Sequence, residues 1–241
     1  MSLVTELGTI MGIWAHPDDE IFSMAGIFTL ASQAGQNTVC VTATRGEQGV
    51  QDESRWPRAD LASIRTLEME QASQILGIKY RHWLDYADGS CREVDIDEAS
   101  NRLAEYINQY QPDTIFTFGV DGLTGHDDHK TMSIWTDRAI EIANSNAKVY
   151  HVVMTKEAYA ELEQADRENN MFFNTDKPWV YSKADCSLLV ELDDETLDKK
   201  MRALEAMPSQ TVNLLGQHKE SVRRSGRTES FILSEHTRRS E

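Results

Sequence analysis

Cysteine is scarce in this 241-residue chain, and the number and spacing of its cysteines exclude a disulfide-stabilised scaffold. The three cysteines, Cys40, Cys91 and Cys186, are odd in number and far apart, and no CxxC pair is present. Such spacing gives neither a disulfide framework nor a cysteine-based metal site. It is typical of free thiols in a reducing compartment, so we expect a cytoplasmic protein.

Long apolar runs and basic residues are also lacking. No run approaches the ~20 residues that a membrane-spanning helix needs, and the N-terminus lacks the basic and apolar regions of a signal peptide. The 24 Lys and Arg residues are outnumbered by 40 Asp and Glu, which gives a formal net charge of −16. Such a surface repels nucleic-acid phosphates and anionic lipids. We therefore expect no nucleic acid and no membrane as partners, whereas a small anionic ligand near Arg45 or Arg65 is compatible with this charge.

What is present is an alternation of strand and helix patterns over the first two-thirds of the chain. Short apolar runs predict strands at Ile10–Trp14, Thr38–Thr44, Tyr80–Trp83, Thr114–Phe118 and Lys148–Met154. Helical patterns between them predict helices at Glu20–Gln33, Asp60–Leu76, Ile96–Tyr110 and Lys130–Asn144. Such alternation implies right-handed crossovers and a parallel sheet. We predict an α/β fold with a Rossmann-like open sheet, mostly parallel, and helices on both faces.

The last third of the chain is patterned less clearly. Thr155–Asn174 is charged and without clear periodicity, Cys186–Leu192 could add a strand, and Asp193–Ala206 is predicted as a helix. The tail Lys219–Glu241 has Phe231–Leu233 as its only apolar anchor. We expect one domain over residues 1–241, with a core at about 8–155 and a less regular C-terminal part at about 156–241.

The first polar cluster directly follows the first predicted strand and reads Ala15-His16-Pro17-Asp18-Asp19-Glu20. One imidazole and three carboxylates within five positions need a cation or a shared proton to be tolerated. A plain helix cap is the alternative, because Asp18 or Asp19 could cap the helix and Glu20 would favour its dipole. That alternative leaves His16 unexplained, so we expect a metal-dependent enzyme.

The second cluster, Gly125-His126-Asp127-Asp128-His129, follows the predicted strand Thr114–Phe118. Taken alone, two histidines three residues apart are often surface loop residues. Both clusters, however, follow strands of a parallel sheet, so they should meet at the same edge, where such folds bind ligands. A His₂Asp set drawn from both fits a catalytic zinc site, which keeps one position open for water. Fe²⁺ or Mn²⁺ could occupy the same set.

These two clusters resemble the signature motifs of the LmbE-like (PIG-L) family. Its members include the N-acetylglucosaminyl-phosphatidylinositol de-N-acetylases, enzymes that deacetylate N-acetylglucosamine conjugates in mycothiol and bacillithiol synthesis, and others that act on chitobiose. Three weaker matches support the resemblance, namely Thr44–Gly49, Arg65 with Glu68, and Leu204–Gln210. The match covers roughly residues 8–155 well and the rest weakly.

The resemblance implies roles for individual residues. The zinc ligands would be His16, Asp19 and His129. Asp18 would be the general base that takes a proton from water. His126 would be the acid or electrophile beside the tetrahedral intermediate, and Asp128 would orient its ring.

The substrate contacts implied by the resemblance are less specific. Arg65 would bind the sugar or its appended group, and Glu47 lies in a loop expected to face the site. An exposed ion pair between Arg65 and Glu68 on one helix is the alternative. Met207 stands where the family usually carries a histidine, and it cannot donate or accept hydrogen bonds as histidine does. We therefore expect a changed substrate contact there.

We predict a zinc-dependent deacetylase that removes an N-acetyl group from a small N-acetylglucosamine-type conjugate. An amidase acting on a larger acyl group of a thiol conjugate or natural product is the first alternative, and a wider, more apolar pocket from Gln51–Asp60 and the C-terminal region would favour it. A non-catalytic sugar- or metal-binding relative is the second, and the intact Asp18 and His126 argue against it. A metal phosphoesterase would need more bridging carboxylates. The partner should be a small-molecule amide, and a homo-oligomer is left open.

Overall fold

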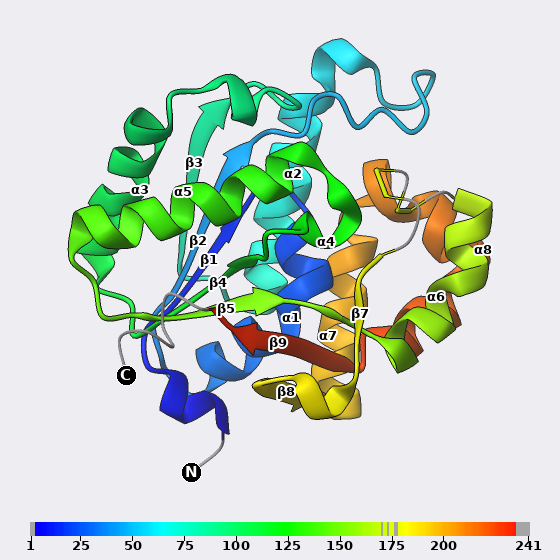
Figure 1. Cartoon of the computed structure of the whole chain (residues 1–241). Helices are drawn as coiled ribbons and strands as arrows, with labels where there is room; N and C mark the ends of the chain where they lie inside the picture. The colour runs from blue at the N-terminus through cyan, green and yellow to red at the C-terminus, as the bar shows by residue number, and fades with distance from the viewer. Residues whose placement is uncertain (1–2, 170, 173, 176–177, 235–241) are drawn as a thin grey trace.

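A computed structural model of the chain describes residues 3–169, 171–172, 174–175 and 178–234. A sheet in the order β3-β2-β1-β4-β5-β9-β8 runs through the molecule (Figure 1). Its strands are β1 (Ile10–Trp14), β2 (Thr38–Thr44), β3 (Tyr80–Tyr86), β4 (Thr114–Phe118), β5 (Lys148–Val152), β8 (Leu188–Glu191) and β9 (Thr228–Leu233). A separate small sheet pairs β6 (Met154–Thr155) with β7 (Val180–Tyr181).

Strands β1 to β5 are parallel, and β9 joins the sheet antiparallel to both β5 and β8. In register, Ile10 of β1 lies between Thr38 of β2 and Thr114 of β4. Every residue of β1, β2 and β4 is buried, which explains why these strands are rich in apolar residues and threonine and carry no charge. The predicted α/β fold with a mostly parallel open sheet is confirmed.

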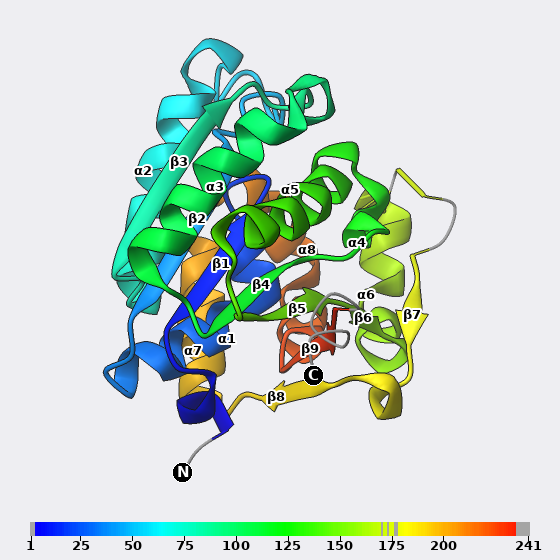
Figure 2. The ribbon, with the colours of Figure 1, turned by 60° about the vertical axis from the view of Figure 1, so that its left-hand side comes forward.

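Helices cover both faces of this sheet (Figures 1 and 2). One face carries α3 (Ile96–Tyr110) and α5 (Asp127–Ala143), which pack against each other. The other carries α1 (Asp19–Gln33), α2 (Arg58–Leu76) and α7 (Asp194–Glu205). The remaining helical segments are α4 (Gly122–Gly125), α6 (Lys156–Asn169), α8 (Pro208–Ser225) and the 3-10 turns η1 (Leu3–Leu7), η2 (Cys91–Glu93) and η3 (Lys183–Asp185). Within the described residues, no helix is both long and apolar enough to cross a bilayer.

The C-terminal part is more regular than its sequence pattern indicates. The segment that shows no clear periodicity forms helix α6, which packs on α8. Its pattern is weak because the helix buries only Leu162 and Ala165. The apolar anchor of the tail belongs to β9, where Phe231 is fully buried and meets Phe116 edge-on at 4.8 Å between ring centroids. The tail thus supplies an inner strand of the sheet.

Helix α1 is kinked beside this added strand. Met24 has non-helical backbone angles (φ −146°, ψ 24°), which frees the N–H groups that follow. The N–H groups of Gly26 and Ile27 donate to the carboxylate of Glu229 at 2.8 and 3.0 Å. Lys200 Nζ lies 2.8 Å from the same carboxylate. The buried ion pair between α7 and β9 therefore provides hydrogen-bond acceptors for the N–H groups that are left without helical partners at the kink of α1.

Candidate metal centre and its surroundings

The two polar clusters meet at the switch point of the sheet. Strands β1 and β4 are neighbours in the sheet. The chain after β1 continues to β2, which flanks β1, whereas the chain after β4 continues in the opposite direction to β5, which flanks β4. The crevice outside the carboxyl ends of such strands is where open α/β sheets bind ligands. His16 follows β1 and His129 lies in the first turn of α5, and their atoms Nδ1 and Nε2 are 3.1 Å apart.

His129 is held with one ring nitrogen directed at the site. Its Nδ1 lies 3.0 Å from the carbonyl oxygen of Gly122, to which it donates, and its ring stacks on Phe118 with centroids 3.9 Å apart. Burial, with the nearby His16 and His126, holds the pKa of His129 well below its usual value. The ring is therefore neutral, and its Nε2 presents a lone pair to His16.

His16 is held from behind by carboxylates. Its Nε2 lies 3.1 Å from Asp88 Oδ1 and 3.3 Å from Asp128 Oδ2, while its Nδ1 faces His129. Burial disfavours the charged ring, but the carboxylates of Asp128 and Asp88 outweigh it and raise the pKa of His16 to about 10. An imidazole that donates one N–H to a carboxylate and aims the other nitrogen at a site is typical of metal ligands.

Asp19 completes the cluster at the first residue of α1. Its Oδ1 lies 3.4 Å from His129 Nε2 and its Oδ2 lies 3.7 Å from His16 Nδ1. The backbone N–H of His16 donates to Oδ2 at 2.7 Å, which fixes the carboxylate. Burial raises the pKa of Asp19 to about 8, although His16 opposes the rise. A cation between these atoms would stabilise the ionised carboxylate.

The spacing of these donor atoms fits one small ion. Zn²⁺ binds nitrogen and oxygen ligands at about 2.0–2.2 Å, so neighbouring ligands of a tetrahedral site are about 3.3 Å apart. His16 Nδ1 lies 3.1 Å from His129 Nε2, and Asp19 reaches the two rings with different oxygens, Oδ1 at 3.4 Å from His129 and Oδ2 at 3.7 Å from His16. Ring nitrogens of His16, His126 and His129 also come within 4.8 Å of one another, as do donor atoms of His16, Asp88 and Asp128. Asp88 and Asp128 each accept backbone N–H groups and both contact His16 Nε2, so they support the ring from behind. His16, Asp19 and His129 stay the predicted ligands.

The carboxylate of Asp128 contacts His16, and its orienting of the His126 ring stays a prediction. Its carboxylate is fully buried and accepts the backbone N–H groups of Gly89 and Cys91 at 2.8 and 3.1 Å, besides lying on His16. These bonds hold the pKa of Asp128 below its usual value against the effect of burial. Asp128 thus joins the loop after β3 to His16.

His126 is instead the N-cap of α5. The backbone N–H of Asp128 donates to His126 Nδ1 at 3.1 Å, because α5 begins at Asp127 and not at the predicted Lys130. Burial and the charge of His16 lower the pKa of the His126 ring. The ring is then neutral, and because Nδ1 accepts a hydrogen bond, its proton lies on Nε2.

Asp88 was missed by sequence reasoning. Its Oδ2 accepts the N–H of Gln48 at 2.8 Å and its Oδ1 faces His16. Burial would raise the pKa of Asp88, but its bond to His16 outweighs this and lowers it to about 2. The prediction ended the third strand at Trp83, three residues before β3 ends. The signal that could have found Asp88 is its position after a parallel strand, where both other clusters lie.

Asp18 lies beside the candidate ligands in a strained conformation. It is the N-cap of α1 with φ 108° and ψ −27°, which costs about 1–3 kcal/mol for a residue other than glycine. Its Oδ2 lies 3.2 Å from an Arg65 guanidinium nitrogen. Burial raises the pKa of Asp18 to about 6, although Arg65 and His16 oppose the rise. A carboxylate with a pKa near neutrality is suited to general-base work.

Arg65 is occupied by the chain itself. It is 3% exposed, donates to the carbonyl oxygen of Gly46 at 2.7 Å and to that of Pro17, and contacts Asp18. Gly46 has φ +67°, and a Cβ there would lie 2.1 Å from the guanidinium, so only glycine permits this approach. The structure gives Arg65 the task of positioning Asp18, and a substrate contact stays a prediction.

The exposed ion pair considered for Arg65 and Glu68 is wrong, since both side chains are buried. Glu68 instead accepts the backbone N–H of Ser209 at 2.9 Å and also its hydroxyl. The next residue, Gln210, donates to the carbonyl oxygen of Gly49 at 3.0 Å. These bonds join the start of α8 to α2 and to the loop after β2.

Two further predicted residues have structural contacts. Glu47 accepts the N–H of Asp88 at 2.9 Å and so supports the loop that holds His16, while its contact with substrate stays a prediction. Met207 is fully buried in the hydrophobic core, where a thioether packs without needing a hydrogen-bond partner.

Comparison with known proteins agrees with this picture. The family model of the GlcNAc-PI de-N-acetylases (PIG-L) matches residues 11–140. A 1D-myo-inositol 2-acetamido-2-deoxy-alpha-D-glucopyranoside deacetylase from Mycobacterium sp. (strain JLS) is 27% identical over 227 residues, covering 83% of this chain and 73% of that protein. A mycothiol S-conjugate amidase from Streptomyces coelicolor is 29% identical over 148 residues, covering 52% of this chain and 49% of that protein.

A solved structure shares the fold. The N,N'-diacetylchitobiose deacetylase from Pyrococcus horikoshii superposes with a TM-score of 0.69 at 20% identity, covering 96% of this chain and 85% of that one. The family match spans more than half of the chain, including β1, β4 and both polar clusters. The chain therefore belongs to the PIG-L family of GlcNAc-PI de-N-acetylases.

Proposed function

We propose that this protein is a metal-dependent hydrolase that cleaves the N-acyl amide of a small amino-sugar conjugate of the N-acetylglucosamine type. The observation that carries the proposal is the convergence of His16 Nδ1, His129 Nε2 and the Asp19 carboxylate, with Asp18 beside them. The deacetylases among its relatives act on such conjugates, which supports this substrate class.

The proposed ligands are His16, Asp19 and His129, and zinc is the ion we favour, with Fe²⁺ or Mn²⁺ as substitutes. A zinc ion held by three protein ligands lowers the pKa of water to about 7 and polarises a carbonyl oxygen. Two of the ligands are oriented from behind by Gly122 and by Asp128 with Asp88. Such support fixes which nitrogen of each ring faces the ion.

Asp18 is the proposed general base. It accepts a proton from the attacking water as the oxygen adds to the amide carbon, and it returns that proton to the nitrogen when the C–N bond breaks. The products are a carboxylate and an amine. The contact with Arg65 at 3.2 Å holds the carboxylate in place and favours its ionised form.

His126 is the proposed electrophile. Its Nδ1 is taken by the backbone N–H of Asp128, so the Nε2–H is left to donate to the oxyanion. The lowered pKa of the ring makes it a neutral hydrogen-bond donor at pH 7 rather than an imidazolium. Removing one such donor from an oxyanion site typically costs about 10²–10³ in turnover.

Release of primary amine from a panel of N-acetylglucosamine derivatives tests this proposal. The panel contains the free sugar, its malate and inositol conjugates, and N,N'-diacetylchitobiose, each with zinc-loaded and with chelated protein. We expect metal-dependent release from at least one member. Release that does not depend on metal, or hydrolysis of a phosphomonoester in its place, would contradict the proposal.

A larger acyl group is the second candidate, because an apolar cavity adjoins the ligands. One of the relatives is a mycothiol S-conjugate amidase, which supports amide cleavage beyond acetyl removal.

We also propose a cytoplasmic location, which the free thiols of Cys40, Cys91 and Cys186 support.

A further inference from the structure

A cavity of about 230 Å³ begins at the candidate metal ligands and extends away from the polar part of the site. Asp19 and His129 line it where α1 begins, and Lys200 and Glu229 line it beside Gly26, two turns further along α1. Its walls come from α1, β4, α4, α5, β5, β6, α6, α7, α8 and β9, and from residues 171–172. The cavity therefore lies under the C-terminal helices, which stand at the side of the sheet next to α1 (Figure 1).

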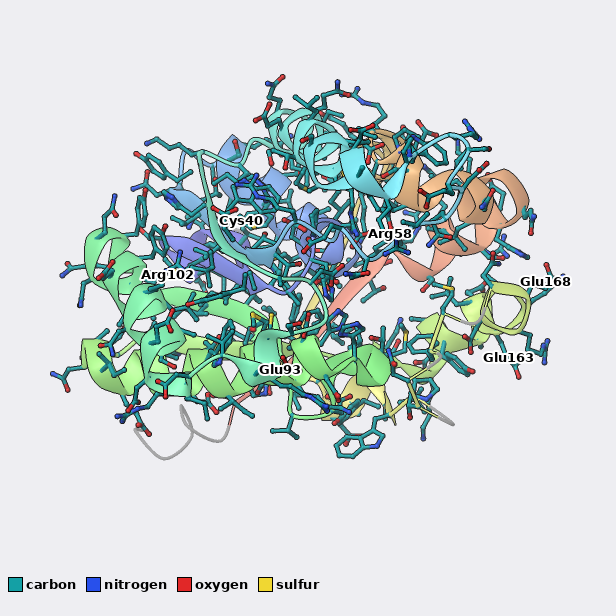
Figure 3. The ribbon with its side chains drawn as sticks, turned by 90° about the horizontal axis from the view of Figure 1, so that it is seen from above. Cys40, Arg58, Glu93, Arg102, Glu163 and Glu168 are labelled. Atoms are coloured by element: carbon teal, nitrogen blue, oxygen red, sulfur yellow. The ribbon has the colours of Figure 1, made fainter. Side chains whose placement is uncertain are left out.

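The walls between the two ends are mainly apolar, and the hydroxyl residues in the lining are Ser23, Thr124, Ser225, Thr228 and Ser230. The main contributors are Phe118, Val152, Leu162, Phe172, Leu204 and Val222, all of them buried. Helix α6 turns its charged residues outwards, as Glu163 and Glu168 show in Figure 3, and its apolar side inwards. Sugar hydroxyls would lose hydrogen bonds to water on entering such a cavity, at a cost that these walls do not offset.

The charged residues at the far end are engaged with each other. Lys200 Nζ binds Glu229 at 2.8 Å and the carbonyl oxygen of Phe22 at 2.9 Å. The carboxylate of Glu229 also receives the N–H groups of Gly26 and Ile27. The pair thus hydrogen-bonds the backbone of α1 at its kink, and its charges are already compensated, so the cavity is suited to an apolar occupant.

The size of the cavity exceeds the need of an acetyl group. An apolar cavity of about 150 Å³ is large enough to bind benzene, which has six carbons. A methyl group alone in the present cavity would leave most of its walls without contacts, and the dispersion energy of those contacts would be lost. A chain of about six to eight carbons would fill it.

We propose that this cavity binds the acyl chain of the substrate and that the preferred acyl group is an aliphatic chain of about six to eight carbons. The inference rests on the proposed function, since it places the scissile carbonyl at the ligands Asp19 and His129. Among the described residues, the segment 51–60 contributes nothing to the lining. The C-terminal helices and β9, and not that loop, would therefore select the acyl group.

A chain-length series tests the inference on the unaltered zinc-loaded protein. The substrates are N-acyl glucosamines with acyl groups of two, four, six, eight and ten carbons, and amine release gives kcat/KM. Each buried methylene contributes about fourfold, so we expect a rise of about 10²-fold from acetyl to hexanoyl and a fall at decanoyl. A flat series, or acetyl as the best substrate, would overturn the inference and leave the proposed function intact. No release at any length would overturn the proposed function itself.

A matched pair of variants on α6 tests where the chain binds. Ala158 lines the cavity and is half-buried, whereas Ala160 is exposed on the same helix. We expect Ala158→Leu to lower kcat/KM for the hexanoyl substrate at least tenfold and to leave the acetyl substrate within about twofold. We expect Ala160→Leu to leave both unchanged. An equal loss on both substrates in Ala158→Leu would contradict a chain bound in this cavity.

Discussion

Nδ1 of His16 lies 3.1 Å from Nε2 of His129, although 113 positions separate the two residues in the chain. Each ring is fixed by its outer nitrogen, His129 by the carbonyl oxygen of Gly122 and His16 by Asp88 and Asp128. The inner nitrogens are therefore directed at each other and at Asp19. Such an arrangement of acceptors is stable when a proton or a metal ion lies between them.

Loss of one imidazole should remove the metal. We expect His129→Ala to lose most of its bound zinc and its activity together, because only two ligands of the proposed set would remain. Elemental analysis of the purified variant measures the zinc content. His82→Ala is the control, since this ring of β3 packs on Tyr106 and bonds Tyr110, both in α3. Full zinc occupancy in His129→Ala would remove that residue from the ligand set.

Loss of the proposed base should spare the metal. We expect Asp18→Asn to keep its zinc and to lose about 10²–10⁴ in kcat, the usual contribution of a general base. Asparagine tolerates the positive φ of this position, so the turn should keep its shape. Asp60→Asn, an exposed change in the first turn of α2, is the control. A kcat close to that of the unaltered protein would end the assignment of Asp18.

Two roles for Asp128 can be distinguished by experiment: positioning His16, which its contact with that ring favours, and orienting His126, which the family resemblance implies. If Asp128 positions His16, Asp128→Asn should weaken zinc affinity about 10–100-fold and change kcat of the zinc-saturated enzyme little. If it orients His126, kcat should fall while zinc affinity stays the same. Competition with a chromophoric chelator gives the affinity, and saturating zinc gives kcat. We expect the first result.

His151 should make stability depend on pH. Burial lowers the pKa of this ring to about 4, below its usual 6.5, so the folded state binds fewer protons than the unfolded state between these values. The contribution of the neutral ring is complete above pH 6.5 and is lost as pH falls towards 4. The unfolding free energy of both proteins should fall when the pH is lowered from 7.5 to 4.5. We expect this fall to be about 2 kcal/mol smaller in His151→Gln than in the unaltered protein.

Urea unfolding of both proteins at the two pH values measures this difference. A chelator in every sample keeps metal release out of the comparison. Parallel loss of stability in the two proteins would show that His151 is not responsible.

The sheet could be predicted from the sequence where its strands are buried on both faces. The predicted bounds of β1, β2 and β4 agree with the structure because each strand is buried throughout and rich in apolar and β-branched residues. The predicted third strand ends before the buried Leu84 because the exposed Asp85 interrupts the apolar pattern. Helix α6 was missed because Leu162 and Ala165 alone give too weak a periodicity, and β9 because its pairing depends on distant strands.

The location of the candidate site could be predicted better than its contacts. The positions of the two polar clusters after parallel strands place His16, Asp19 and His129 at one edge of the sheet. The partners of Arg65, Glu47 and Asp128 could not be predicted in the same way. They depend on how the loops after β2 and β3 approach the site, and no periodic pattern describes such loops.

The two polar clusters, on this proposal, form one metal site. Anomalous diffraction at the zinc edge from crystals grown with zinc would locate the ion. We expect a single peak about 2.0–2.2 Å from His16 Nδ1, His129 Nε2 and an oxygen of Asp19. A peak between His16, Asp88 and Asp128, or no peak in protein that releases amine, would contradict it.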